Sequence, residues 1–450
     1  MRKTNIKPGV IGKDGRTSAI ERCLVESHRH WKGPPIRLSE WKNMSPDEAR
    51  EQVLRNAQEQ RPDFVIVGPE EPLEAGIVDA LEGIGIPCVG PKSALARLES
   101  SKAFTRDLVS KYGIPGNPEY KVFRNLDGIE KYLKKLSDYV VKPDGLTGGK
   151  GVRISNAQLF SIQDSLYYCE ELFRQHCAVV IEEKLDGEEF SLQSLCDGTH
   201  VKDMVVVQDH KRVGEGDTGP NTGGMGSYSC EDHNLPFLRP GELQEASEIN
   251  KAIAAALLKE TNQKYKGILY GGFMVTRNGV RLLEYNARFG DPETLNVLSV
   301  LETDFIDICE AIIEEKLHEL PVTFERRATV CKYVVPDRYP DNPVKGERID
   351  LSRVSRDSEK LRIYRAAVEE KDGELYLTGS RAVAFVGIGR NLQEAEAVAE
   401  KAASSVRGPV FHRRDIGTHE LIERKIAHVK SFSNSSDPHF VRPVSGSASG

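Results

Sequence analysis

The segment VVKPDGLTGGKGVRIS, residues 140–155, decides the fold of the central part of the chain. Lys142 ends one predicted strand, a glycine-rich turn containing Lys150 follows, and a second strand comes after the turn. Backbone N–H groups in such a turn, together with a lysine, can close over phosphates. The segment is not a P-loop, because no Gly-Lys-Ser/Thr sequence opens a helix there. Considered alone, it is explained equally well by a glycine-rich hairpin with incidental lysines.

Upstream of this segment, short apolar runs alternate with helical patterns. The run DFVIVG, residues 63–68, predicts a buried strand, and residues 93–113 predict one helix that ends at Gly113. Strands that alternate with helices predict a parallel, doubly wound sheet. The N-terminal region is therefore expected to be an α/β domain.

Downstream, the chain is richer in strands, which predicts an α+β organisation. Residues 270–286 predict a hairpin, in which Asn278 and Gly279 indicate a type I′ turn. From about residue 321 the pattern predicts a small β-rich domain. The end of the chain, residues 431–450, is rich in Ser, Gly and Pro and is expected to be disordered.

The composition is that of a globular protein of two or three domains. The chain has 450 residues, of which 39% are hydrophobic and 29% charged, and its net charge is -6. This charge provides no uniform basic field for nucleic acid, so the expected partner is a small molecule. The eight cysteines are scattered without a C-x-x-C pair, and no apolar run has the length of a signal or membrane segment. We therefore expect a cytoplasmic protein that binds neither nucleic acid nor membrane.

A second polar constellation is LLEYNARFGDPE, residues 282–293. Glu284 and Asn286 are two positions apart in a predicted strand, so they project to the same face and could share a hard cation such as Mg2+. Arg288 has the same parity and could meet an anionic group beyond them. A solvated polar face on an edge strand is the alternative for any one of these residues.

A third constellation is QDHKRVGEGDTGPNTGGMG, residues 208–226, which combines six glycines with many ionisable side chains. Glycines let a chain lie close to a ligand, and acidic and basic groups together can hold a zwitterion or a phosphate. The alternative is a disordered charged loop.

In this order, the three segments resemble those of the ATP-grasp ligases, and within them the glycinamide ribonucleotide synthetase family, the phosphoribosylamine-glycine ligases. The segments VGPEEPLEAGIVDALEGIGIPCVGP, ARLESSKAF, VVIEEKLDGEEFSL and HRRDIG add to the resemblance, which runs from about residue 62 to residue 418. The resemblance implies a doubly wound N-terminal domain over residues 1–116 and an ATP-grasp domain with a small flap subdomain over residues 117–320. A β-rich domain over residues 321–430 and the tail 431–450 complete the expected order.

The resemblance implies that ATP and Mg2+, or Mn2+, are the cofactors. Lys102 and Lys142 would contact the phosphates of ATP. The remaining nucleotide contacts would come from the flap, from a segment against adenine and from a residue at the ribose: Gly148, Gly149, Lys150, Glu182, Glu183, Leu185 and Glu189. Glu284 and Asn286 would bind the metal ion.

The resemblance also implies that glycine and 5-phosphoribosylamine are the substrates. Asp209, Lys211 and Arg288 are the expected catalytic residues and would also touch substrate. The other expected substrate contacts are Gly12, Gly15, Arg16, Asn221, Asp291 and Pro292. The products would be glycinamide ribonucleotide, ADP and phosphate, formed through a glycyl phosphate by a monomer or weak homo-oligomer.

The N-terminal turn departs from the family pattern. Thr17 and Ser18 stand where the family has Glu and His, and KGPPIRLSEWKN, residues 32–43, replaces a Pro-Gly-Asn segment. A related ligase that joins another amino acid to another amine therefore remains an alternative. A non-catalytic nucleotide-binding protein is the alternative from another class, although such a protein has no need for the pair Glu284 and Asn286.

Overall fold

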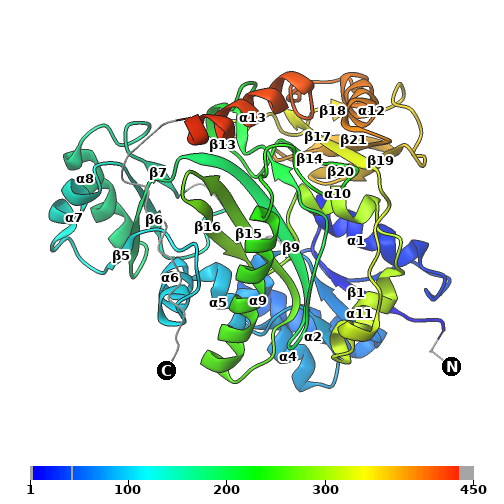
Figure 1. Ribbon diagram of the computed structural model, residues 1–450. Helices are drawn as coiled ribbons and strands as arrows, with labels where there is room; N and C mark the ends of the chain where they lie inside the picture. Colours follow the sequence, from blue (N-terminus) through cyan, green and yellow to red (C-terminus); the bar gives the residue numbers. More distant parts are fainter. Residues whose placement is uncertain (1–3, 42–43, 149–150, 435–450) are drawn as a thin grey trace.

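The computed structural model describes residues 4–41, 44–148 and 151–434. Figure 1 shows a main body from which one small lobe, residues 120–183, projects to the left. Gly149 and Lys150 of the predicted flap, and residues 435–450 of the predicted tail, lie outside the described residues. Within those described ranges, no helix is both long and apolar enough to span a bilayer.

The first hundred residues form the predicted doubly wound sheet. Its elements are β1 (Pro8–Ile11), α1 (Gly15–Glu26), β2 (Ile36–Ser39), α2 (Pro46–Gln60), β3 (Phe64–Val67), α3 (Glu70–Glu74), α4 (Ile77–Gly83), β4 (Cys88–Val89), α5 (Ser93–Ser100) and α6 (Lys102–Lys111). All four strands are parallel, in the order β2-β1-β3-β4. The connections run in opposite directions from β1 and β3, so the loops after these strands border a crevice of the kind that binds ligands.

The prediction of one helix over residues 93–113 is wrong, because α5 ends at Ser100 and α6 begins at Lys102. Ser101 between them has φ -134° and ψ 106°, which are not helical angles. Its hydroxyl accepts a hydrogen bond from the Phe104 N–H at 3.1 Å and so caps α6. The break places Lys102 at the start of α6, where its Nζ donates to the carbonyl of Gly145 at 2.9 Å.

The small lobe contains the segment that opened the sequence analysis. Its elements are β5 (Tyr120–Phe123), α7 (Ile129–Leu136), β6 (Tyr139–Pro143), β7 (Arg153–Ile154), α8 (Ile162–Phe173) and β8 (Val179–Glu183). They form an antiparallel sheet, β5-β8-β6-β7, with the two helices packed together beside it. Val140 pairs with Ile154, so the glycine-rich segment does connect two antiparallel strands as predicted.

The central sheet is antiparallel, in the order β10-β9-β15-β16. This part comprises β9 (Gly187–Asp197), β10 (Val201–Asp203), α9 (Glu242–Thr261), β15 (Lys266–Thr276), β16 (Gly279–Asn286), α10 (Glu293–Ser299), α11 (Phe305–Ile313) and the 3-10 helix η1 (Leu317–Glu319). The predicted type I′ turn between β15 and β16 is wrong. Thr276 pairs with Gly279, and of Asn278 and Gly279 only the glycine has a positive φ, 88°.

A second large sheet joins the segment 208–229 to the C-terminal region. Its strands are β11 (Gln208–Asp209), β14 (Gly226–Ser229), β17 (Ala328–Pro336), β19 (Leu361–Arg365), β22 (Val383–Gly389) and β23 (Val410–Phe411). The smaller elements around it are β12 (Arg212–Gly214), β13 (Thr218–Asn221), β18 (Arg348–Ile349), β20 (Val368–Lys371), β21 (Glu374–Leu377) and α12 (Leu392–Ser404). Because β14 pairs with β17, the predicted ligand segment is built into the C-terminal sheet.

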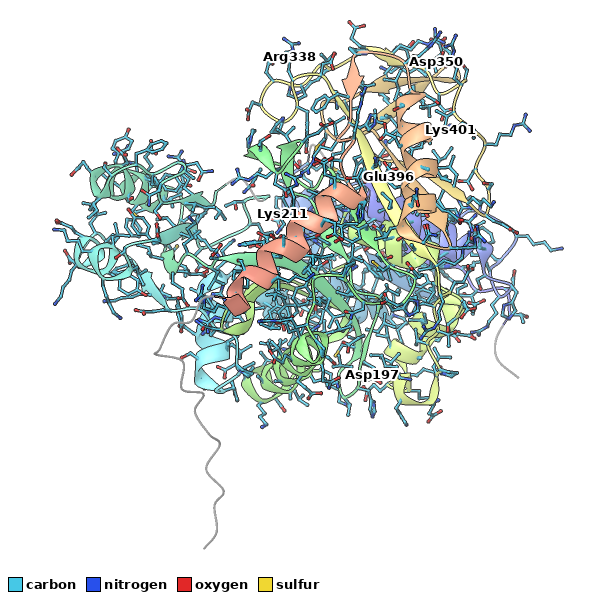
Figure 2. The ribbon with its side chains drawn as sticks, turned by 45° about the horizontal axis from the view of Figure 1, so that its top comes forward. Asp197, Lys211, Arg338, Asp350, Glu396 and Lys401 are labelled. Atoms are coloured by element: carbon cyan, nitrogen blue, oxygen red, sulfur yellow. The ribbon has the colours of Figure 1, made fainter. Side chains whose placement is uncertain are left out.

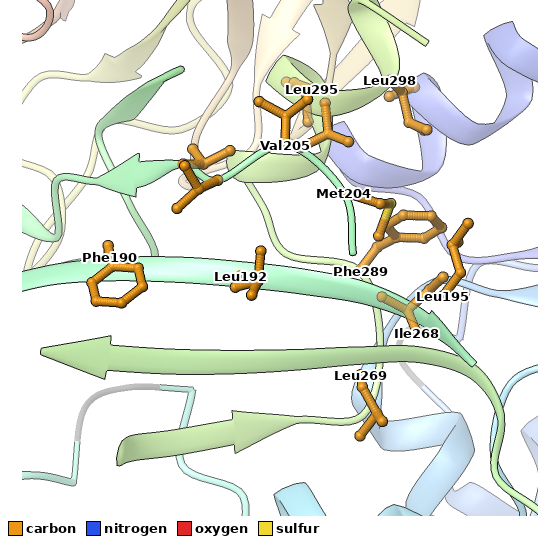
Figure 3. Packing of buried hydrophobic residues seen from close by; sticks show 14 of the residues in the cluster. Phe190, Leu192, Leu195, Met204, Val205, Ile268, Leu269, Phe289, Leu295 and Leu298 are labelled. Carbon is orange, nitrogen blue, oxygen red and sulfur yellow. The ribbon is translucent and has the colours of Figure 1, made fainter. Parts of the chain in front are cut away.

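The main hydrophobic core lies between the central sheet and the helices above it. Figure 3 shows Leu195 of β9 and Ile268 of β15 beside Met204 and Phe289, with Val205 nearer to Leu295 of α10. These side chains are almost fully buried, and burial of such residues is the main source of folding free energy. The core fixes β9, β15 and α10, from which the polar side chains described below project.

The last element of the described residues is a helix that the sequence analysis missed, α13 (His419–Asn434). The first four residues of the expected disordered tail, 431–434, belong to this helix, so the predicted boundary is wrong by at least that length. Figure 1 shows α13 lying across the top of the body above β9. Leu421, Val429 and Phe432 are buried, which explains why this polar segment is helical here.

Candidate active site

A cleft of about 610 Å³ is lined by residues of both the lobe and the main body. Most of the predicted site residues line it: Arg16, Lys102, Lys142, Gly148, Glu182, Glu183, Leu185, Glu189, Asp209, Lys211, Asn221, Glu284, Asn286, Arg288 and Asp291. They come from segments that are nearly 300 residues apart in the chain. The fold therefore brings the three polar constellations together in one place.

Three predicted substrate residues, Gly12, Gly15 and Pro292, are not among the described residues that line the cleft. Gly12 has φ 128°, and a Cβ there would lie 2.6 Å from the hydroxyl of Thr17. A Cβ on Gly15 would lie 1.8 Å from the hydroxyl oxygen of Tyr333. Pro292 precedes α10 as its N-cap residue. Both positions require glycine for packing, and the substrate contacts that the family resemblance implies for them stay a prediction.

Glu284 and Asn286, the predicted metal pair, lie at the end of β16 and both face the cleft. Lys211 approaches Glu284, with Nζ 3.4 Å from Oε1, and it is the main reason that the pKa of Glu284 is lowered to about 2. Arg288 donates to the amide oxygen of Asn286 at 3.2 Å. An ionised carboxylate and an amide oxygen two positions apart are a donor set that fits a hard divalent cation.

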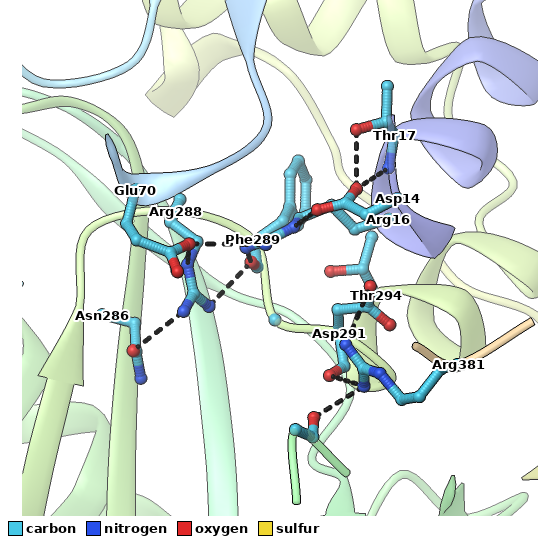
Figure 4. Close-up of polar contacts among 12 residues, drawn as sticks. Asp14, Arg16, Thr17, Glu70, Asn286, Arg288, Phe289, Asp291, Thr294 and Arg381 are labelled. Atoms are coloured by element: carbon cyan, nitrogen blue, oxygen red, sulfur yellow. Dashed lines mark hydrogen bonds and ion pairs between the residues drawn. The ribbon is translucent and has the colours of Figure 1, made fainter. Parts of the chain in front are cut away.

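Arg288 joins this pair to the N-terminal domain (Figure 4). Its Nε lies 3.0 Å from Oε2 of Glu70, and its Nη2 lies 2.8 Å from Oε1 of Glu99. Arg16, at the start of α1, pairs with Asp14 at 2.7 Å and reaches Glu70 at 3.4 Å. These groups meet because the loops after β1 and β3 border the crevice of the parallel sheet, as its strand order predicts.

The pKa values of the two carboxylates beside Arg288 shift in opposite directions, because the nearby arginines outweigh burial at one of them and not at the other. Burial disfavours ionisation of Glu70, but Arg288 and Arg16 outweigh it and lower the pKa of Glu70 to about 2. For Glu99 burial dominates over Arg288 and raises the pKa to about 7. One carboxylate is thus firmly ionised and the other is close to titration at neutral pH.

The variant Glu70→Gln should flatten the loss of stability in acid. Because the folded-state pKa of about 2 lies below the ordinary 4.5, ionised Glu70 stabilises the fold above pH 4.5, and this contribution is lost as the pH falls from 4.5 towards 2. The thermal midpoint of the parent should therefore fall more between about pH 6 and about pH 3 than that of the variant. The neighbouring substitution Glu71→Gln, at a group whose pKa burial raises, should not reproduce the flattening. Parallel curves for the parent and Glu70→Gln would contradict the assignment.

The side chain of Glu182 is held inside the protein by two cations. Arg106 of α6 donates to it with Nε at 2.7 Å and with Nη2 at 2.9 Å, and Lys142 Nζ lies 2.6 Å from Oε2. Burial lowers the pKa of Lys142, against the attraction of Glu182. Sequence reasoning missed Arg106, which lies in the helix between two quoted segments and carries no motif of its own.

The segment 208–226 is an ordered part of the cleft wall, and the alternative of a disordered charged loop is wrong. Asp217 pairs with Arg413 at 2.9 Å and with Lys425 of α13 at 2.6 Å. The N–H of Gly216 donates to the carboxylate of Asp415 at 2.8 Å. The C-terminal segment therefore holds this part of the chain in place.

Two predicted catalytic residues of this segment, Asp209 and Lys211, lie in a partly buried, charged environment. Burial, and then Glu293, raises the pKa of Asp209 well above its ordinary value. Lys211 lies 3.4 Å from both Glu189 and Glu284, and these carboxylates raise its pKa although burial opposes them. His210 between them is buried, with no partner for either ring nitrogen in the described structure, and burial lowers its pKa to about 3.

Two further basic residues at the cleft were not predicted. Arg381 follows β21 and donates to the carbonyls of Gly223 and Asp291, at 2.6 and 2.7 Å. Lys425 lines the cleft from α13 and pairs with Glu188 at 3.0 Å. Neither residue belongs to a glycine-rich or strand-end pattern, so only the tertiary structure identifies them.

Comparisons with known proteins agree with this arrangement. Three family models, described as the N, ATP-grasp (A) and C domains of phosphoribosylglycinamide synthetase, match residues 7–99, 100–294 and 329–419. The chain is 44% identical over 433 residues to a phosphoribosylamine--glycine ligase of Methanocaldococcus jannaschii, covering 93% of this chain and 97% of the relative. The corresponding protein of Methanocella arvoryzae is 44% identical over 429 residues, covering 93% of this chain and 98% of the relative.

Solved structures show the same fold. A phosphoribosylamine--glycine ligase of Thermotoga maritima superposes with a TM-score of 0.73 at 27% identity, over 91% of this chain and 100% of that one. The biotin carboxylase domain of a Hydrogenobacter thermophilus 2-oxoglutarate carboxylase, in complex with MgADP, has a TM-score of 0.68 at 13% identity, over 95% of this chain and 94% of that one, and supports the fold alone. Because the three family models match most of its length and the curated relatives are matched almost from end to end, the chain belongs to the phosphoribosylglycinamide synthetase family.

Proposed function

We propose that the protein is an ATP-dependent ligase that joins glycine to 5-phosphoribosylamine through a glycyl phosphate. The observation that carries this proposal is the meeting of Glu284, Asn286 and Arg288 with two lysines, Lys102 and Lys142, around one cleft. Membership of the phosphoribosylglycinamide synthetase family identifies the reaction class. The products are glycinamide ribonucleotide, ADP and phosphate, which belong to purine biosynthesis.

The nucleotide is assigned to the wall of the cleft that the lobe forms. Residues 117–320 are assigned to the ATP-grasp domain, which follows the N-terminal domain, residues 1–116, and precedes the C-terminal domain, residues 321–430. Lys142 and Lys102 would face its phosphates, and Gly148 belongs to the segment expected to form the flap. Backbone groups of Glu182, Glu183 and Leu185 meet adenine, while Glu189 reaches the ribose. This use of backbone groups suits Glu182, whose side chain is already bound by Arg106 and Lys142.

Glu284 and Asn286 would hold Mg2+, or Mn2+, at the phosphate end of the cleft. When bound, the ion would neutralise charge on the transferring phosphoryl group. Arg288 donates to the amide oxygen of Asn286 at 3.2 Å and so fixes the orientation of this amide. Lys211, beside Glu284, adds positive charge where the phosphoryl group meets the carboxylate of glycine.

The substrates are assigned to the substrate wall, the side of the cleft that the main body forms opposite the lobe. Asp209 and Lys211 can hold the amino and carboxylate groups of glycine, with Asn221 and Asp291 beside them. Arg16 and Arg288 offer positive charge for the phosphate of the ribosyl substrate. Because both arginines are already held by Glu70, the ribosyl phosphate would be bound by groups fixed in advance.

The two chemical steps balance without a protein nucleophile. A glycine carboxylate oxygen attacks the γ-phosphorus of ATP, and ADP leaves. The amine of phosphoribosylamine then attacks the carbonyl carbon, loses a proton, and phosphate leaves. Positioning and charge neutralisation are what the side chains must provide, and exclusion of water protects the acyl phosphate.

Oxygen-18 transfer tests the proposal. Glycine labelled in its carboxylate, with ATP and phosphoribosylamine generated in situ, should give ADP and labelled inorganic phosphate. An adenylating ligase would instead give AMP and pyrophosphate, and unlabelled phosphate would contradict an acyl phosphate. Turnover with a different amine but not with phosphoribosylamine would favour the related ligase.

The two altered residues of the N-terminal turn, Thr17 and Ser18, are not among the described residues that line the cleft, although Arg16 beside them is. Thr17 donates its hydroxyl to Asp14 at 2.6 Å, and Ser18 donates to the carbonyl of Arg365 at 2.5 Å. Both hydroxyl groups are therefore used in contacts within the protein. This supports phosphoribosylamine as the amine in spite of the departure from the family pattern.

The variant Lys425→Met should lower kcat/KM by roughly tenfold or more, because misplaced substrate contacts are costly even when the chemistry is intact. Lys425 Nζ pairs with Glu188, which precedes the expected ribose contact Glu189, and also with Asp217 of the substrate wall. Steady-state kinetics with ATP and with glycine as the varied substrate measure the effect. The control is Lys430→Met, an exposed lysine of the same helix. Equal losses in both variants would indicate a role of α13 in stability only.

A further inference from the structure

A second cluster of ligand-type side chains lies on the opposite side of the protein from the cleft. Asp197, His200 and His318 each offer one nitrogen or oxygen atom, and these atoms all lie within 4.8 Å of one another. Figure 2 shows Asp197 at the lower edge of the body, well separated from Lys211 of the cleft. The proposed ligase reaction uses none of the three residues.

Asp197 is a buried carboxylate without a strong counter-charge. It ends β9, its side chain is 0% exposed, and among the described residues its one ion-pair partner is His200. Backbone N–H groups of Thr199 and His200 donate to Oδ1, at 2.9 and 2.7 Å, and that of Leu317 donates to Oδ2 at 3.0 Å. These three hydrogen bonds fix the carboxylate in one orientation, so Asp197 offers a positioned oxygen ligand.

The two histidines place their rings against this carboxylate. His200, in the turn between β9 and β10, has Nδ1 3.1 Å from Oδ2 of Asp197. The ring of His318, on η1, lies 4.3 Å from that of His200 between centroids, at 33°. The side chains of His200 and His318 are 37% and 50% exposed, so solvent ions can reach both. The bond from Leu317 to Asp197 fixes η1 beside the turn and thus fixes the position of His318.

We propose that Asp197, His200 and His318 form a binding site for a divalent transition metal ion of the Zn2+ type, separate from the catalytic cleft. Imidazole nitrogens with one carboxylate oxygen suit Zn2+, whereas Mg2+ and Ca2+ prefer oxygen ligands only. Three protein ligands leave a fourth position for water. Side-chain rotation would bring the ligand atoms, now within 4.8 Å of one another, to tetrahedral spacing.

The expected consequence is a link between distant segments. The ion would join η1 to the β9–β10 turn, two segments that are more than 100 residues apart in the chain. It would also neutralise a buried carboxylate that the described structure leaves with a histidine alone as counter-charge. Binding to the folded state only must raise the thermal midpoint.

Calorimetric titration of the full chain with Zn2+ tests the proposal. Cys177 is exposed and could bind Zn2+ by itself, so the parent for this experiment is Cys177→Ser. Excess Mg2+ in all solutions occupies oxygen sites in the cleft. We expect one Zn2+ per chain and a raised thermal midpoint, with affinity at least roughly tenfold lower in His200→Ala and in His318→Gln. A Co2+-loaded parent should show visible absorption that both variants lose.

The matched control is His419→Ala, an exposed histidine outside the cluster, which should bind Zn2+ like the parent. Ligase activity should be unchanged in His200→Ala and His318→Gln, because both lie far from the cleft. His318 is half exposed, so the loss of binding in His318→Gln cannot be attributed to unfolding. Parent-like affinity in both cluster variants, or no Zn2+ binding by the parent, would overturn the proposal.

Discussion

Replacing Glu284 by glutamine is expected to slow ADP formation by roughly a hundredfold or more while the fold survives. Glutamine keeps the shape of the side chain but removes the charge that would bind the metal ion and pair with Lys211. The pKa of Glu284, lowered to about 2 chiefly by Lys211, means that the carboxylate is ionised under assay conditions. Single-turnover ADP formation at saturating Mg2+ measures the loss directly.

The thermal midpoint separates this catalytic effect from a structural one. The Glu284 side chain is 38% exposed, and Lys211 keeps its second partner, Glu189, so little stability should be lost. The control Glu374→Gln removes a similarly exposed glutamate, 39%, from a single ion pair on β21, away from the cleft. Near-normal turnover in Glu284→Gln would refute the metal assignment, and a collapsed midpoint would assign Glu284 a structural role.

The sequence predicted the parts of the fold in which local pattern and tertiary structure agree. The run at residues 63–68 is apolar and β-branched, and it forms the buried strand β3. The helix predicted over residues 93–113 failed because Ser101 caps a new helix, and periodicity continues through such a break. The segment α13 was missed because its helical structure depends on burial of a few apolar side chains among many polar ones.

The candidate site also contains residues that a local pattern identifies and residues that only tertiary contacts identify. Residues in strand-end and glycine-rich patterns, such as Glu284 and Lys142, were identified and lie on the cleft. Glu70 and Glu99 carry no local pattern, although they hold Arg288 in position. Such partners are defined only when the loops of the parallel sheet meet the end of β16. Ion pairs between segments distant in the chain thus need the folded structure to be seen.

The variant Arg288→Met should lose both activity and stability. Methionine removes a positive charge that is assigned to the ribosyl phosphate, and it frees the amide oxygen of Asn286 in the proposed metal pair, so we expect turnover to fall by roughly a hundredfold or more. It also leaves Glu99, whose side chain is 8% exposed, without its arginine, and breaking a buried pair in this way costs about 3 kcal/mol. The control is Arg22→Met, which removes an arginine that pairs with Glu26 and Asp357 outside the cleft.

Adding Glu99→Gln separates the loss of stability from the loss of activity, because the two losses have different causes. In the parent, the pKa of Glu99 is raised from the ordinary value of 4.5 to about 7, although Arg288 opposes the rise. Without Arg288 this pKa should rise further. A raised folded-state pKa means that stability falls as the pH rises from 4.5 towards that pKa, so the deficit of Arg288→Met should be larger at about pH 8 than at about pH 6. Glu99→Gln removes this titration and keeps an oxygen that can accept from the Ala287 N–H, a bond of 2.7 Å in the parent.

The double variant Arg288→Met with Glu99→Gln should therefore regain much of the lost thermal midpoint and its pH independence, but none of the lost turnover. Recovery of turnover together with stability would mean that Arg288 acts by holding Glu99 and the fold around it. Recovery of stability alone would mean that Arg288 acts at the cleft, because the double variant still lacks its charge there and its hydrogen bond to Asn286.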